Sequence, residues 1–313
     1  MATESSNYQG IMRDIRKELL PAYICGYSFV AVIHLFGLLL LRRVKFQPTN
    51  QRIVIINLAF AELFLNLHQF IVHIFLMMDR CDIHTLCDLV DKFFYLFLGN
   101  ANKLIMIYLI IDRLLDVHLH IRYPLYFTEQ RVTYIMLAIW LLCFIYAILV
   151  IILIRFKIGN RQAITWFVLL FHIGIDTVIV LSALITYIFL YMKVRHFRAI
   201  DISQRRAGKN NDIKVSNKTK FLLPCLIIAT YLVFNNTANV MFLHKYFFME
   251  AGHAKSLISE ISHWFWILGH LSDGVLYIFL QKDVRKRLVA IFKKRRIESV
   301  PATSEISVQC PRN

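Results

Sequence analysis

The sequence contains few charged residues, which make up 18% of its 313 positions. A soluble domain usually carries about 25% charged residues, because its surface faces water. Cysteine is scarce as well, and six cysteines in a chain of this length do not form a disulfide scaffold. The motifs of serine hydrolases, zinc proteases, phosphate-binding loops and redox dithiols are missing. We therefore expect neither a soluble domain nor an enzyme.

Apolar and basic side chains are both abundant. The apolar set accounts for 58% of the residues, with 25 Phe and 14 Tyr, which excludes a disordered chain. The formal charge is +16, from 36 Lys and Arg against 20 Asp and Glu. A chain that is apolar and basic at once is typical of a lipid-embedded body with basic loops.

Seven stretches are long and apolar enough to cross a membrane as helices. Such a helix needs about 20 mostly apolar residues to cross about 30 Å of hydrocarbon. The alternating pattern of a membrane β-barrel is missing, and so is an internal repeat like those of many transporters. The sequence therefore predicts an all-α membrane protein, a seven-transmembrane helix bundle with spans at 21–41, 53–78, 89–111, 132–154, 163–192, 221–243 and 261–280.

The basic residues divide unevenly between the two sides of this bundle. The segments 42–52, 112–131, 193–220 and 281–313 hold 25 of the 36 Lys and Arg, whereas the segments on the other side hold nine. Basic residues concentrate in cytosolic segments of membrane proteins. We therefore expect a multi-pass protein of the plasma membrane with an extracellular amino terminus.

The chain divides into four parts under this topology. Residues 1–20 are the extracellular tail, and residues 21–280 are the transmembrane domain. In 281–296 apolar residues share one face among basic ones, which predicts a short amphipathic cytosolic helix on anionic membrane lipid. A solvated basic tail is the alternative for this segment. Residues 297–313 are predicted to be disordered.

Short motifs lie in order on the second, third, fourth and seventh spans. They are NLAFAE at 57–62, DRL at 112–114 with PL at 124–125 in the next loop, Trp140, and DGVLY at 273–277. In this order they resemble the NLAxAD, DRY, fourth-helix tryptophan and (N/D)PxxY signatures of the rhodopsin-like G protein-coupled receptors. The resemblance covers about residues 20–295.

The resemblance implies a cell-surface receptor that binds an unknown extracellular ligand and couples to a heterotrimeric G protein. In the family, the arginine of the third span is held by the neighbouring aspartate and meets the G protein after activation. An interfacial arginine that only reaches the lipid head groups is the alternative. The residues that the resemblance assigns to G protein coupling and the activation switch are Asp112, Arg113, Tyr187, Asp273 and Tyr277.

The chain departs from the family pattern at several places. His34 replaces the usual asparagine of the first span, and Gly274 replaces the proline of the seventh. The sixth span lacks CWxP and carries Pro224 closer to the cytosol. Cys87 lies near the usual outer cysteine of the third span, but the second outer loop has no cysteine, so we expect the family disulfide to be missing. A local Cys81–Cys87 bond stays an open alternative.

Polar residues occur deep in four of the predicted spans. Ionisable groups there cost about 2.5–3.5 kcal/mol each, so they should face the bundle interior and find partners. Two facing carboxylates cannot both stay ionised without a cation. A sodium ion, shared protons and a plain hydrogen-bond network are the alternatives for this group, and we favour a role in switching over inert packing. Its members are His34, Glu62, Asn102, His270 and Asp273.

Lys103 is one residue further along the third span, where an ammonium needs a counter-ion. Asp176 lies at comparable depth in the fifth span, which predicts a buried Lys103–Asp176 pair. Pairing of Lys103 with Glu62 is the competing arrangement.

A group of polar and aromatic residues in the outer half predicts a ligand pocket. Tyr95 takes the place where amine receptors keep an aspartate, which argues against classical monoamines. Ile267 takes the place where opsins carry the retinal lysine, so no retinal is expected. Ordinary interhelical packing is an equal alternative for each member. The group comprises Gln69, His73, Tyr95, His172, Asn239, His263 and Trp264.

A membrane transporter or channel is the rival function, with Glu62, Asp273 and Lys103 as an ion or proton path. This rival explains the buried charges but not the ordered motifs. We expect no metal site, because the 12 histidines form no close ligand pair with supporting Cys or Glu. We expect no nucleic-acid partner either, since a G protein or anionic lipid explains the basic loop better.

Overall fold

The computed structural model describes residues 2–43, 49–78, 86–119, 123–156, 161–206, 226–241, 253–279 and 289. Within these ranges every regular element is a helix, which confirms the all-helical prediction. The helices are α1 (Ala2–Arg43), α2 (Thr49–Met77), α3 (Leu86–Leu119), the short α4 (Tyr123–Tyr126), α5 (Glu129–Arg155), α6 (Arg161–Arg206) and α9 (His253–Phe279).

One further helix, Leu226–Met241, precedes α9 and is called the 226–241 helix below. Its middle turn, η2 (Tyr231–Asn235), is a π-helix, in which the amide of Asn236 donates to the carbonyl of Tyr231 five residues earlier. An α-helix closes its turns over four residues, so this turn is wider by one residue.

Five helices are long and apolar enough to cross a membrane. They contain the segments Glu18–Arg42, Asn50–Met77, Leu89–Asp116, Glu129–Arg155 and Leu170–Phe189, which coincide with the first five predicted spans. The 226–241 helix is apolar but shorter, and α9 is long enough but not among the five. Large side chains on the outer surface are apolar, for example Leu141, Leu142 and Leu184. Such surface is typical of lipid contact rather than of a soluble monomer.

Three helices are longer than the sequence predicts. α3 continues to Leu119, past the expected end of the third span at residue 111. α1 begins at Ala2 and continues through Pro21, so the expected boundary between tail and membrane domain at residue 20 falls inside one helix. α6 has 46 residues and extends to Arg206, past the expected end of the fifth span at residue 192. The expected segments 281–296 and 297–313 and the residue Pro224 lie outside the described ranges.

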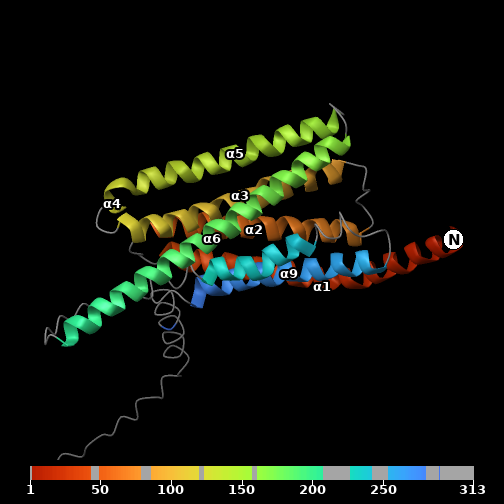
Figure 1. Ribbon diagram of the computed structural model, residues 1–313. Coiled ribbons are helices and arrows are strands. Elements are labelled where there is room, and N and C mark those ends of the chain that lie inside the picture. The colour runs from red at the N-terminus through yellow and green to blue at the C-terminus, as the bar shows by residue number, and fades with distance from the viewer. Residues whose placement is uncertain are drawn as a thin grey trace, which may run out of the picture.

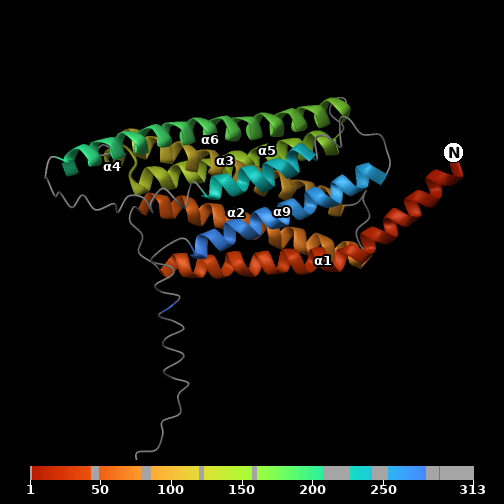
Figure 2. The ribbon, with the colours of Figure 1, turned by 60° about the horizontal axis from the view of Figure 1, so that its bottom comes forward.

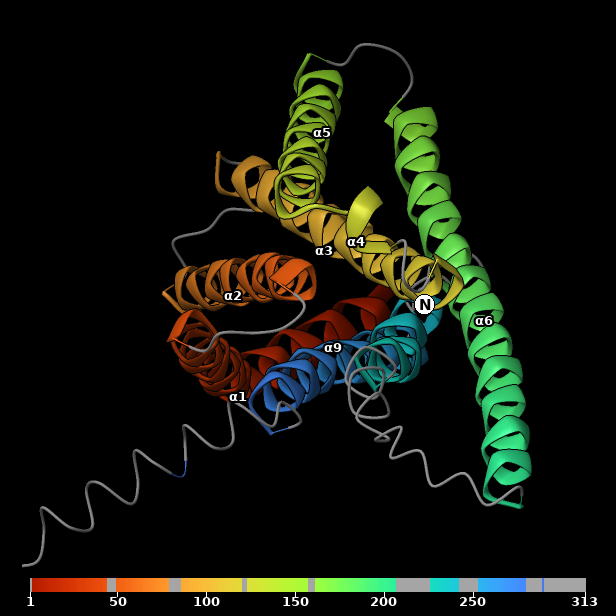
Figure 3. The ribbon, with the colours of Figure 1, turned by 90° about the vertical axis from the view of Figure 1, so that its left-hand side faces the viewer.

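The helices lie side by side along one direction (Figure 1, Figure 2). α4 and the carboxyl end of α6 lie at one end of the bundle, here named the α4 end, and the amino terminus lies at the other. Viewed along the bundle, α3 lies at the centre and contacts α2, α5 and α6 (Figure 3). α1 packs on α2 and α9.

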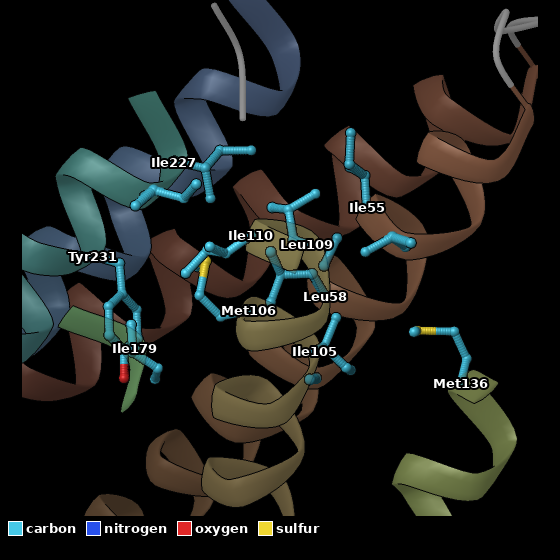
Figure 4. Packing of buried hydrophobic residues seen from close by; sticks show 14 of the residues in the cluster. Ile55, Leu58, Ile105, Met106, Leu109, Ile110, Met136, Ile179, Ile227 and Tyr231 are labelled. Carbon is cyan, nitrogen blue, oxygen red and sulfur yellow. The ribbon is translucent and has the colours of Figure 1, made fainter. Parts of the chain in front are cut away.

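The largest apolar core surrounds α3 at the middle of the bundle. Ile105, Met106 and Leu109 of α3 are fully buried there, and they meet side chains of α2, α6 and the 226–241 helix (Figure 4). In lipid, such contacts stabilise mainly through close packing, because the surrounding tails are equally apolar.

Close packing of α1 on α9 depends on Gly274. A Cβ atom at this position would lie 2.8 Å from Cγ2 of Ile33 and 3.2 Å from Nε2 of His34. Ile33 is β-branched and therefore stiff at its first side-chain torsion, so it cannot easily move aside. Glycine at this place in the DGVLY motif thus lets α1 approach α9.

We predict that Gly274→Ala destabilises the protein by about 1–3 kcal/mol, because overpacking forces α1 and α9 apart. Thermal unfolding of the purified full-length protein in detergent measures the effect. Gly174→Ala is the matched control, since a Cβ there has no neighbour within 4 Å. Equal unfolding temperatures for both variants would contradict the close approach of α1 and α9.

Candidate functional site

The α4 end contains a buried ion pair within the DRL motif. Nε of Arg113 donates to Oδ2 of Asp112 over 3.1 Å, and a terminal nitrogen of the same guanidinium bonds to that oxygen. A second terminal nitrogen lies 3.2 Å from Oδ2 of Asp116. Asp112 is fully buried and Arg113 is 2% exposed. Arg113 therefore does not reach for head groups here, which disfavours the snorkelling alternative.

Tyr123 closes this pair from the first residue of α4. Its hydroxyl donates to Oδ1 of Asp112, so both carboxylate oxygens are occupied. Burial and then the Asp112 carboxylate raise the pKa of the Tyr123 hydroxyl, which keeps the hydroxyl protonated as a donor. The ring of Tyr123 stacks on Phe127 at 5.0 Å. Tyr123 thus brings a phenol from α4 back to the aspartate of the motif.

Two further motif residues stabilise the helices around this end. Nε1 of Trp140 in α5 donates to Oδ1 of Asn57 in α2 over 2.9 Å. The Asn50 amide donates to the carbonyl of Phe127, just after α4.

Tyr187 of α6 is half-buried against the apolar core. Tyr277 lies in α9, and its side chain is outside the described residues.

A group of buried polar side chains lies between α1, α2 and α9. Nε2 of His34 is 2.8 Å from the carbonyl oxygen of His270 and 3.1 Å from Oε2 of Glu62. A nitrogen that faces two oxygen acceptors carries a proton and donates it. The Glu62 and Asp273 carboxyl groups are close enough for their charges to interact, and His34, Glu62 and Asp273 are fully buried.

Asp273 is also held from the 226–241 helix. The hydroxyl of Thr230 donates to Oδ1 of Asp273 over 2.6 Å. Four oxygens of the group have no hydrogen-bond partner among the described residues: both carboxyl oxygens of Glu62, Oδ1 of Asn102 and Oδ2 of Asp273. Oxygen atoms are the ligands of hard cations. These residues therefore fit a sodium ion, and they fit a shared proton equally well.

Lys103 and Asp176 lie in contact between α3 and α6. The ammonium nitrogen is 2.8 Å from Oδ1 and 2.9 Å from Oδ2 of the carboxylate. Tyr231 donates to Oδ1 over 3.3 Å, and Asn239 donates to Oδ2 over 2.9 Å. Each carboxylate oxygen thus accepts two hydrogen bonds. Glu62, the competing partner of Lys103, contacts His34 instead.

A cavity of about 60 Å³ adjoins the Lys103 side chain. This volume holds several water molecules, at roughly 10–15 Å³ each by the same measure. Of the seven residues expected in a ligand pocket, Gln69, Tyr95, His172 and Asn239 line it. The other lining residues are Tyr27, Leu65, Asn66, Gly99, Asn102, Lys103, Tyr231, Asn235, Trp266 and His270.

The remaining three expected pocket residues form a separate aromatic cluster near the end opposite to α4. The rings of His73 and His263 have centroids 5.4 Å apart, and Trp264 packs on Tyr23 at 5.2 Å. The Tyr27 hydroxyl lies 2.8 Å from Nε2 of His263. The buried Tyr23 donates to the Glu260 carboxylate. This cluster ties α1 to α2 and α9.

The sequence did not reveal which side chains of neighbouring helices donate hydrogen bonds to the buried aspartates. Tyr123, Thr230 and Tyr231 each donate to an aspartate, yet none lies in a motif that we recognised. Tyr123 could have been found from its place next to Pro124, because proline favours the first turn of a helix. Trp266, two residues from the expected Trp264, faces the cavity because it lies on another face of α9.

Other expected features have a simple place in the structure. Ile267 is buried in the cluster of Tyr23 and Tyr27. The described part of the chain holds no group of three or more His, Cys, Asp or Glu residues that could bind a metal ion. The side chains of Cys81 and Cys87 lie outside the described residues.

No protein-family model matches the chain, and no curated protein matches it.

We predict that a charge reversal at Lys103 or at Asp176 alone destabilises the fold by about 3–5 kcal/mol, because each leaves like charges buried together. The exchange of the two residues, Lys103→Asp with Asp176→Lys, should recover at least half of the loss. A lysine at position 176 could still bond to the carbonyl oxygen of the Asn239 amide and to the Tyr231 hydroxyl.

Thermal unfolding of the three purified variants measures this double-mutant cycle, and the interaction energy between the two sites is the difference from additivity. If the exchanged variant is as unstable as the two single reversals together, the pair does not stabilise the bundle.

Proposed function

We propose that the protein is a plasma-membrane receptor with seven spans and an extracellular amino terminus, which activates a heterotrimeric G protein when an extracellular ligand binds. The observation that carries the proposal is the closed arrangement of Asp112, Arg113 and Tyr123 at the α4 end. The buried guanidinium is held by Asp112 and Asp116, and Asp112 is held in turn by the phenol of Tyr123, so loss of these contacts can release Arg113 to a partner. The concentration of basic residues in the segments on this side supports its cytosolic placement.

The sixth and seventh spans of this proposal are the 226–241 helix and α9. The 226–241 helix is apolar but shorter than the other five, whereas α9 carries polar residues in its interior. His270 and Asp273 face the bundle interior, where they meet His34 and Thr230. A polar residue inside the membrane must be enclosed by protein, so a less apolar helix fits a place against the bundle.

The proposed mechanism is a shift between two conformations of the bundle. A ligand that binds the cavity beside Lys103 more tightly in one conformation displaces the equilibrium toward it. The available free energy is the difference between the ligand's affinities for the two states. Separation of the cytosolic ends of α6 and the 226–241 helix then frees Arg113, with Tyr187 and Tyr277 rearranging to admit the G protein.

The His34, Glu62, Asn102 and Asp273 group is proposed to bias this equilibrium. A sodium ion or a proton held by the unpartnered oxygens would neutralise the facing carboxyl groups and favour the compact arrangement. His34 already lies 3.1 Å from Glu62 and is bonded to α9 through the His270 carbonyl.

We predict that Tyr123→Phe raises ligand-independent nucleotide exchange on the G protein by about tenfold or more. The variant removes one hydrogen bond to the Asp112 carboxylate, and a bond to a charged group contributes about 1.5–3 kcal/mol. Nucleotide exchange by a panel of purified G proteins with the full-length protein in lipid nanodiscs measures this effect. Tyr126→Phe is the matched control, because Tyr126 lies in the same short helix and is exposed.

We predict that Arg113→Ala abolishes exchange in the same assay, with and without Tyr123→Phe. Substitution of the arginine removes the group that is proposed to meet the G protein. If wild-type protein and Tyr123→Phe activate no G protein of the panel, while proteoliposomes show ion or proton flux that Asp273→Asn stops, the transporter or channel reading replaces the receptor.

A further inference from the structure

The π turn of the 226–241 helix lies between two buried carboxylates. Thr230, the residue before the turn, donates to Asp273 of α9 over 2.6 Å. Tyr231, its first residue, and Asn239, beyond its end, donate to the two oxygens of Asp176 in α6. The wide turn is thus held on one side by α9 and on the other by α6.

The width of the turn brings the two Asp176 donors onto one face. Tyr231 and Asn239 are eight residues apart, and in an uninterrupted α-helix of 3.6 residues per turn they would point about 80° apart. A π turn takes up one additional residue, so the two residues relate as if they were seven apart and point about 20° apart. The turn therefore acts as a one-residue insertion that directs both donors toward the Asp176 carboxylate.

On its inner side, the turn is not tied to the present register by a side-chain hydrogen bond of Asn235. Asn235 closes the turn, and it is 4% exposed with no hydrogen-bond partner among the described residues for either amide atom. Its side chain fits against Gly269 of α9, where a Cβ atom would lie 2.6 Å from Oδ1 of Asn235. Asn235 also lines the cavity beside Lys103. The amide is thus buried without a hydrogen bond that would fix it to one position.

We propose that the π turn is a movable register element, clamped in its present place by Asp176 and Asp273. When Tyr231 leaves Asp176, the extra residue can pass along the helix. When the wide turn moves past a residue, that residue rotates by about 100° about the helix axis. The parts of the helix on either side of the moved segment keep their orientation. Movement toward the α4 end rotates Thr230 away from Asp273. The turn therefore couples loss of a hydrogen-bond donor from Asp176 to release of the Asp273 carboxyl group, which lies between α2 and α9.

The first arm of the test removes the extra residue. Val233 lies within the turn and is 56% exposed, so its side chain contributes little packing. Deletion of Val233 should convert the turn into an α-turn and leave both flanks in register, with the unfolding temperature of the full-length protein within a few degrees of wild type. Deletion of Leu142, which is 60% exposed in the regular helix α5, is the matched control. It should rotate Cys143, Ala147 and Val150 out of the core and abolish the folded yield.

The second arm measures amide hydrogen exchange of residues 226–241 in lipid nanodiscs. Tyr231→Phe removes one clamp, and it should speed exchange across this helix at least tenfold in the wild-type background. In the Val233 deletion the same substitution should change exchange less than twofold, because no second register remains. A comparable acceleration in both backgrounds, or a Val233 deletion that folds no better than the Leu142 deletion, would overturn the proposal. Neither readout involves a G protein, so the result stands apart from that of the proposed receptor function.

Discussion

A charged side chain within hydrocarbon needs a partner from a neighbouring helix, and this constraint sets how the bundle is assembled around α3. Apolar contacts alone fix the rotation of a membrane helix weakly, because lipid is as apolar as the neighbouring helix. α3 carries Lys103 in its middle and Arg113 near its end, and each meets carboxylates that further helices hold in place. Asp176 comes from α6, and Tyr123 of α4 holds Asp112. These polar contacts determine which face of α3 meets which neighbour.

His34 and Gly274 depend on one another. The imidazole ring of His34 needs room between α1 and α9. Gly274 supplies that room, since a Cβ atom there would lie 3.2 Å from Nε2 of His34. The imidazole then reaches the carbonyl of His270, one turn before Gly274 in α9. The two residues thus form a single local arrangement, in which a side chain of α1 bonds to the backbone of α9.

The sequence could predict the helical class and the first five apolar spans, because long apolar runs follow directly from the thickness of hydrocarbon. It could also propose Asp176 beside Lys103, since an isolated ammonium at that depth needs an acid at a similar depth. It could not predict the π turn, because backbone hydrogen bonds that span five residues instead of four leave no pattern of side chains in 231–235. It also grouped Trp264 rather than Trp266 with the cavity, because the rotation of α9 depends on contacts with α1 that no single span encodes. Hydroxyl donors such as Thr230 are equally hidden, since threonine occurs in membrane helices for many reasons.

The length of α6 has a mechanical consequence. From residue 192 to Arg206 the helix continues for 14 residues, which is about 21 Å at 1.5 Å per residue. A rod of this length converts a tilt of about 10° within the bundle into a displacement of about 4 Å at its tip. The tip carries Arg205 and Arg206, so a small change around Asp176 moves a pair of positive charges over a distance comparable to a hydrogen bond. α6 can thereby act as a lever arm.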